Sequence, residues 1–129
     1  MRTAKPQTSN RWVLLRHVGA PDDAKGIHFD LLIEDKKFCR TWRLRDMPIV
    51  DGPHVDSFYS SPHHLDWLEI HEKFVSGNRG IATRIKQGIY SGSLPISEKK
   101  HIKLSLIWED LECDLVINKN GCRIFSKKC

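Results

Sequence analysis

The segment from Arg11 to Glu34 constrains the fold more than any other part of the chain, because it reads as two strands joined by a loop. The apolar run 12–15 is rich in residues that favour β-structure, and glycine and proline residues interrupt the chain after it. Extended chain resumes over 27–34. If the two strands pair antiparallel across the loop, their ends meet at one rim of a sheet.

Three polar side chains lie at this rim and suit a metal site. Residues two apart on a strand project from the same face, so His28 and Asp30 point together. Antiparallel pairing returns His17, at the end of the first strand, beside them. Two imidazoles and one carboxylate suit Mn²⁺, Zn²⁺ or Fe²⁺, with positions left for water and substrate. The same spacing also fits an ordinary hydrogen-bonded pair on a half-exposed strand, with His17 as a strand terminus.

The rest of the chain predicts short strands separated by loops. Further strands are expected over 38–44, 68–76, 81–88, 102–108, 113–118 and 122–125. Two segments dense in turn-forming residues, 45–62 and 89–101, are expected to be loops. The segment 77–80 predicts a hairpin turn, with a phosphate-binding nest as the alternative. Seven or eight short strands with one or two helical turns predict a mainly β protein, a small antiparallel barrel or sandwich.

A helical turn is expected after residue 61, where Ser61 and Pro62 form a cap followed by a first-turn proline. The free amides of a helix N-terminus bind anions, so His63 or His64 at this position is a candidate phosphate contact. The alternative is a surface turn whose histidines are simply solvated.

Composition limits the class of protein. The length of 129 residues fits one domain, with a disordered lead-in over 1–10 and a single folded domain over 11–129. The four cysteines contain no CxxC pair, so we expect free thiols in a reducing compartment. The absence of a long apolar run predicts a cytoplasmic protein without a membrane span. The formal net charge of +5 favours an anionic partner without identifying one.

The order of these features carries a family resemblance. A strand ends in His17, the run 28–31 reads His-Phe-Asp-Leu, and Glu34 precedes a charged turn. A strand with Trp42 follows, and then the run 62–67, Pro-His-His-Leu-Asp-Trp. This order resembles the 3′-phosphoesterase module of bacterial DNA ligases of the non-homologous end-joining pathway, which also occurs as a stand-alone protein. The resemblance covers roughly residues 11 to 125, with the histidine–aspartate signature as its most specific part.

The resemblance implies a fold, an activity and a set of site residues. The family fold is a small β-barrel with a crescent groove, and its members remove 3′-terminal ribonucleotides and 3′-phosphates from DNA ends with Mn²⁺. By position, His17, His28 and Asp30 match the metal ligands, with Zn²⁺ or another divalent cation as alternatives to Mn²⁺. His63 matches the histidine that contacts the phosphate and is the candidate catalytic residue. The resemblance implies a monomer that acts on nucleic-acid 3′ ends. It also implies a separate DNA ligase or repair protein as a partner.

The sequence departs from the family at the phosphate contacts. Leu32 stands where the family has an arginine, the segment 54–61 lacks a second family arginine, and Trp67 replaces a tyrosine. Each lost guanidinium removes a charge-assisted contact of roughly 1.5 to 3 kcal/mol. The candidates to replace these contacts, or otherwise to bind phosphate or nucleic acid, are Arg16, Arg43, Arg79, Arg84, His64 and Trp67.

Three functions therefore remain open from the sequence. The first is a metal-dependent phosphoesterase acting on nucleic-acid 3′ ends in DNA repair. The second is a module that binds such ends without catalysis, which the loss of the arginines permits. The third is a metal-dependent hydrolase of another phosphorylated substrate. Salt dependence separates the last two, because a polyanion binder loses affinity steeply as salt is added.

Overall fold

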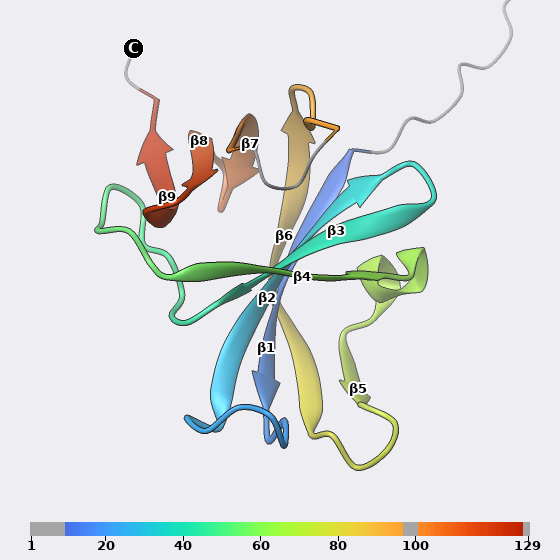
Figure 1. Ribbon diagram of the computed structural model, residues 1–129. Coiled ribbons are helices and arrows are strands. Elements are labelled where there is room, and N and C mark those ends of the chain that lie inside the picture. The colour runs from blue at the N-terminus through green and yellow to red at the C-terminus, as the bar shows by residue number, and fades with distance from the viewer. Residues whose placement is uncertain (1–9, 97–100, 128–129) are drawn as a thin grey trace, which may run out of the picture.

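Residues 10–96 and 101–127 are described by a computed structural model, and they form nine strands and one short 3₁₀ helix (Figure 1). The strands are β1 Arg11–Val18, β2 Ile27–Asp35, β3 Phe38–Leu44, β4 Ser57–His63, β5 Glu72–Phe74, β6 Ile81–Ser91, β7 Ile102–Trp108, β8 Leu111–Asn118 and β9 Gly121–Ser126. The helix, η1, spans Leu65–Glu69. The predicted mainly β class is confirmed.

The strands form one antiparallel sheet that curls into a half-barrel. Eight strands follow the order β4-β3-β2-β1-β6-β7-β8-β9, and β5 pairs with β6 beside this path. Figure 1 shows β4 crossing in front of the first strands, with β7 to β9 grouped at the upper left. The two ends of the sheet meet where Val55, just before β4, forms an isolated bridge with Cys122 of β9. The main-chain hydrogen bonds of this bridge therefore tie the curled sheet at its open side.

Alternation along the strands divides the apolar residues between two cores. The larger core lies inside the curled sheet, where side chains of β1 to β3 meet those of β7 to β9. In it, the Trp12 and Trp108 rings stack with centroids 4.9 Å apart. The smaller core lies on the opposite face of β1, β2, β3 and β6 and includes Leu32 and Leu68. Since Leu68 belongs to η1, this helix covers the face on which His28 and Asp30 were predicted to project.

The predicted loop over 45–62 is partly wrong, because its end forms the strand β4. This strand lies at one end of the sheet order and pairs only with β3 among the named strands. An edge strand tolerates proline, which explains how Pro62 fits within it. The register shifts between Cys39 and Thr41, where β3 faces the end of β4. The helical turn expected from His63 consequently starts two residues later, at Leu65, and His63 belongs to β4.

Two further boundaries differ from the sequence predictions. The expected strand over 68–76 shrinks to β5, because Leu68 is buried in the smaller core as part of η1. The loop expected over 89–101 starts later, because β6 continues to Ser91 through pairing of Tyr90 with Leu106 of β7. The hairpin turn expected over 77–80, before β6, is confirmed.

Some sequence expectations lie outside the described residues. These are the disordered lead-in, apart from Asn10, and the state of Cys129. The other three cysteines, Cys39, Cys113 and Cys122, are buried free thiols, as expected. Among the described residues, no helix has the length and apolar character needed to cross a membrane.

Candidate metal centre

The pairing of β1 with β2 brings the predicted ligands together. His17 lies opposite His28, and Asp30 lies opposite Leu15, two residues back along β1. All three side chains project from the same face because side-chain direction alternates along each strand. One ligand atom from each of His17, His28 and Asp30 lies within 4.8 Å of the others. The predicted convergence of the three residues is therefore confirmed.

His28 has a carboxylate oxygen near each of its ring nitrogens. The side chain is 2% exposed, and its Nδ1 lies 2.9 Å from the Asp23 Oδ2 atom. Its Nε2 lies 3.3 Å from Oδ2 of Asp30. A neutral imidazole has one N–H donor, so donation from Nδ1 to Asp23 leaves the Nε2 lone pair facing Asp30. A carboxylate behind a histidine in this way orients the ring and raises its basicity as a metal ligand.

His17 is oriented by a main-chain acceptor. Its Nε2 lies 2.7 Å from the Arg79 carbonyl oxygen, so Nε2 donates and Nδ1 keeps its lone pair. This Nδ1 lies 3.6 Å from Oδ2 of Asp30, the same oxygen that Nε2 of His28 faces. The two rings meet edge to face, with centroids 4.8 Å apart. Both histidines thus direct an unprotonated nitrogen toward one carboxylate oxygen.

The donor set fits a divalent cation. Two imidazole nitrogens and a carboxylate oxygen are each electron-rich, and they face one another with no donated proton between them in these tautomers. Such groups repel one another unless a cation or an added proton lies between them. Three protein ligands of this kind leave coordination positions open, as in catalytic metal sites. The residues present therefore fit Mn²⁺, Zn²⁺ or a similar ion.

The electrostatics of the cluster favour ionised carboxylates. When a proton rather than a cation lies between the ligand atoms, Asp30 accepts hydrogen bonds from His17 and His28, which outweigh the opposing effect of burial and hold the pKa of this carboxyl well below its usual range. The hydrogen bond with His28 likewise lowers the pKa of Asp23. Asp30 likewise raises the pKa of His17, because its carboxylate accepts from Nδ1 once that nitrogen is protonated. Two negative charges are thus present at neutral pH beside the candidate ligand atoms.

A cleft of about 650 Å³ opens beside the cluster. His17 and Asp30 line it together with four of the other predicted site residues, Arg43, His63, Trp67 and Arg79. The Nδ1 of His63 lies 3.0 Å from the Thr41 hydroxyl, which itself donates to a main-chain carbonyl. Nδ1 therefore donates to Thr41, and Nε2 is the nitrogen left for a group in the cleft. The Trp67 ring packs edge to face on His63, with centroids 5.6 Å apart.

Arg43 is the arginine closest in register to the candidate ligands. It lies directly opposite Asp30 in the pairing of β2 with β3, on the same face of the sheet. Its guanidinium is 3.5 Å from the exposed carboxylate of Asp22, which is a long contact. Leu32, where the family resemblance places an arginine, is fully buried in the smaller core. A guanidinium therefore reaches this part of the cleft from β3 and not from β2.

The other predicted phosphate-binding residues lie in varied positions. Arg79 lines the cleft, but its guanidinium bonds to Ser76. Arg84 bonds instead to the Leu68 carbonyl oxygen and the His71 ring. Arg16 of β1 lies opposite Phe29 of β2, and the Phe29 side chain packs against the larger core. Arg16 therefore projects from the face opposite to the candidate ligands. His64 caps η1 by accepting from the Asp66 amide and is not among the residues that line the cleft.

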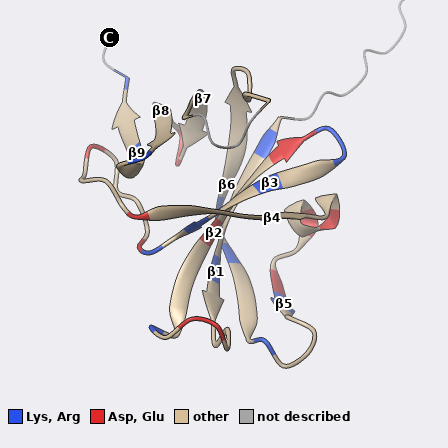
Figure 2. Cartoon of the chain, viewed as in Figure 1, with Lys and Arg blue, Asp and Glu red and all other residues tan. Residues whose placement is uncertain are grey.

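Sequence reasoning missed Asp23 as the hydrogen-bond partner of His28. Asp23 lies in the β1–β2 loop, whose acidic residues are visible at the base of Figure 2. The available signal was a Pro-Asp-Asp run in a loop joining two strands that both carry candidate ligands. A carboxylate in that loop is well placed to hydrogen-bond a ligand histidine.

Replacing Asp23 with asparagine is expected to weaken divalent metal binding by about 10- to 100-fold. The amide keeps the shape of the side chain but removes the charge that orients and polarises His28. Isothermal titration with Mn²⁺ measures the change. Asp22→Asn is the matched control, because this neighbour is exposed and pairs with Arg43 instead. Equal affinities in wild type and Asp23→Asn would show that Asp23 does not support a metal ligand.

No protein-family model matches the chain, and a comparison with curated proteins gives no match. The residues of the cleft and their geometry therefore provide the basis for assigning a function.

Proposed function

We propose that this protein is a divalent-metal-dependent phosphoesterase that acts on the 3′ ends of nucleic acid, in the context of DNA repair. The observation that carries the proposal is the pair of histidines, each fixed through one nitrogen, whose other nitrogens face one oxygen of Asp30. The cleft beside them holds a histidine and an arginine suited to a phosphate. The order of the same residues along the chain resembles the 3′-phosphoesterase module.

The candidate ligands and His63 each have a task in this reaction. His17, His28 and Asp30 would hold Mn²⁺, or Zn²⁺ or another divalent cation. When bound, the cation supplies Lewis-acid polarisation of a phosphoryl group. His63 is held by Thr41 with Nε2 toward the cleft, so its protonated form can donate to a phosphate oxygen or to the leaving oxygen.

Arg43 provides the anion contact of the site. Its guanidinium is planar and permanently charged, and it can bond two phosphate oxygens at once. It reaches the cleft beside Asp30, and among the described residues its guanidinium is held by the long contact to Asp22. Trp67 holds the His63 ring from the other side and narrows the space open to water.

The direct test is phosphate release from a DNA duplex with a 3′-phosphate, with Mn²⁺ or with a chelator. We expect release with Mn²⁺, loss of release with the chelator, and no release from the same duplex carrying a 5′-phosphate. Binding of the 3′ end without release would instead support a non-catalytic end-binding module. Release only from a small phosphorylated compound, with weak salt dependence, would support a hydrolase of another substrate.

Replacing Arg43 with alanine is expected to lower kcat/KM for phosphate release by a free energy of about 1.5 to 3 kcal/mol. The reason is the loss of a charge-assisted contact to the phosphate. Arg16→Ala is the matched control, because Arg16 lies on the same sheet but projects from the other face. Steady-state kinetics on both variants checks the prediction. A similar loss in both variants would point to general basic charge, and no loss in Arg43→Ala would remove this residue from the site.

A further inference from the structure

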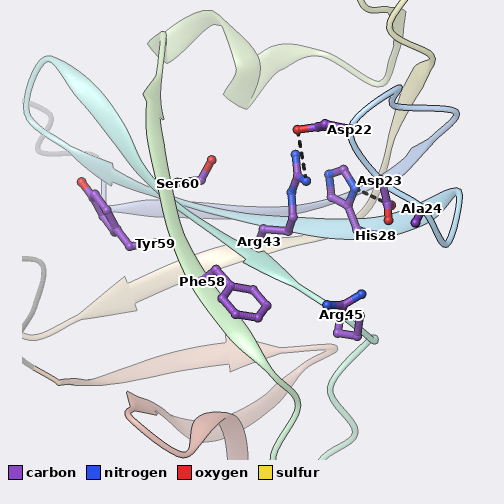
Figure 3. Close-up of a pocket in the computed structure, with 9 residues that line it drawn as sticks. All are labelled: Asp22, Asp23, Ala24, His28, Arg43, Arg45, Phe58, Tyr59 and Ser60. Carbon is purple, nitrogen blue, oxygen red and sulfur yellow. Dashed lines mark hydrogen bonds and ion pairs between the residues drawn. The ribbon is translucent and has the colours of Figure 1, made fainter.

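A second cleft, of about 490 Å³, adjoins the one lined by His17 and Asp30, and the third candidate ligand, His28, lines this second cleft. The two clefts share Asp22, Arg43 and Ser60 among their lining residues. Figure 3 shows this second cleft, with the side chains of Phe58 and Arg45 on the side of Arg43 away from Asp22. Arg43 therefore lines both the cleft that suits a phosphate and a second cleft that also reaches Phe58 and Arg45.

Strand register aligns lining residues of the two clefts in one row across the sheet. Asp30 of β2 lies opposite Arg43 of β3, and Arg43 lies opposite Phe58 of β4. Residues paired in this way project from the same face, and neighbouring strands lie about 4.8 Å apart. A metal ligand, a guanidinium and an aromatic ring thus follow one another across three strands. A group bound beside Arg43 has Phe58 one strand further from the metal ligands.

The Phe58 ring is available to a ligand. It is 52% exposed, although a phenyl ring gains free energy from leaving water. The Arg45 guanidinium carbon lies 5.9 Å from the ring centroid, so a cation is already held at the ring. An exposed aromatic side chain with an arginine beside it is the arrangement that stacks nucleic-acid bases in many single-strand binding sites.

We propose that the second cleft is a nucleobase subsite, in which Phe58 stacks the base of the 3′-terminal nucleotide while its phosphate lies against Arg43. This inference rests on the proposed function, since it names the substrate group next to the phosphate. The base is planar and aromatic, so it matches the ring, and Arg45 adds a cation at the same place. Stacking is tolerant of base identity, so the subsite requires a base without selecting one.

The test compares two DNA ends that differ only in the terminal base. Both carry a 3′-methylenephosphonate, which cannot be hydrolysed, and one ends in adenine while the other has an abasic tetrahydrofuran residue. Binding is measured with Mn²⁺ by fluorescence anisotropy. We expect wild type to bind the base-bearing end about tenfold more tightly than the abasic end, the size of effect that one stacked base produces.

Variants then assign the preference to the ring. Phe58→Ala and Phe58→Leu should bind both ends equally, because leucine keeps apolar bulk but has no aromatic face. Phe74→Ala should keep the wild-type preference, because Phe74 is 77% exposed on β5, outside both clefts. Since Phe58 is half exposed on an edge strand, its replacement leaves the core intact. A preference that survives Phe58→Ala, or wild type without any preference, would overturn the subsite.

Phosphate release from matching 3′-phosphate ends, measured in parallel, separates this inference from the proposed function. Equal release from base-bearing and abasic ends would remove the subsite and leave the phosphoesterase in place. A Phe58-dependent base preference without any release would leave the subsite in place and remove the enzyme. Wild type that neither binds nor hydrolyses either end would overturn both.

Discussion

Alanine in place of His28 should abolish divalent metal binding and, with it, phosphate release. His28 is buried between two carboxylates and directs Nε2 toward the Asp30 oxygen that Nδ1 of His17 also faces. Without it, only two protein ligands remain, one histidine and one carboxylate. The Asp23 carboxylate, which accepts a hydrogen bond from His28, also loses its partner. We therefore expect a larger loss of Mn²⁺ affinity than the 10- to 100-fold or so that removal of an outer-shell partner causes.

Two measurements on the same samples check this result. Isothermal titration gives the Mn²⁺ affinity, and a colorimetric assay gives phosphate release from a 3′-phosphate end. His101→Ala is the control, since His101 is exposed and lies just before β7. Circular dichroism confirms that the variant stays folded, which matters because the change leaves Asp23 and Asp30 buried without this histidine. A folded variant that binds Mn²⁺ as wild type does would show that the cluster is a hydrogen-bonded network and not a metal centre.

The candidate ligands could be predicted from the sequence because they lie on two strands that one loop joins. The pairing of β1 with β2 spans one loop, and side-chain alternation on a strand has a fixed period of two residues. Once that loop was identified, His28 and Asp30 had to share a face, and antiparallel return placed His17 beside them. The outcome depends only on this one pairing and not on how the remaining strands are arranged.

The parts that sequence reasoning missed depend on contacts between distant segments. Thr41 accepts from His63 only because β4 pairs with β3 at a shifted register. Phe58 lies opposite Arg43 through the regular part of the same strand pairing. Because β4 lies in a segment dense in turn-forming residues, its composition favours a loop, and pairing with β3 overrides that local preference. Neither the partner strand nor the register can be read from that segment alone.

The second large effect is expected in Gly121→Ala, which should lose stability because Gly121 lies where the half-barrel closes. Gly121 begins β9 with φ +118°, and a Cβ at this position would lie 2.3 Å from the Val55 carbonyl oxygen. That oxygen accepts from the Cys122 amide at 2.8 Å, and the Val55 amide donates back at 2.9 Å. These two bonds form the isolated bridge between the ends of the sheet. A methyl group must therefore displace the main chain at this closure.

Gly26→Ala separates the effect of the clash from that of backbone strain. Gly26 also has a positive φ, +84°, but a Cβ there meets nothing within 4 Å. Left-handed backbone costs a non-glycine residue about 1 to 2 kcal/mol, and overpacking adds about 1 to 3 kcal/mol. Gly26→Ala should thus lose about 1 to 2 kcal/mol and Gly121→Ala about 2 to 5 kcal/mol in the free energy of unfolding. Urea unfolding followed by tryptophan fluorescence measures both, and equal losses would mean that a methyl group at Gly121 does not disturb the bridge between Val55 and Cys122.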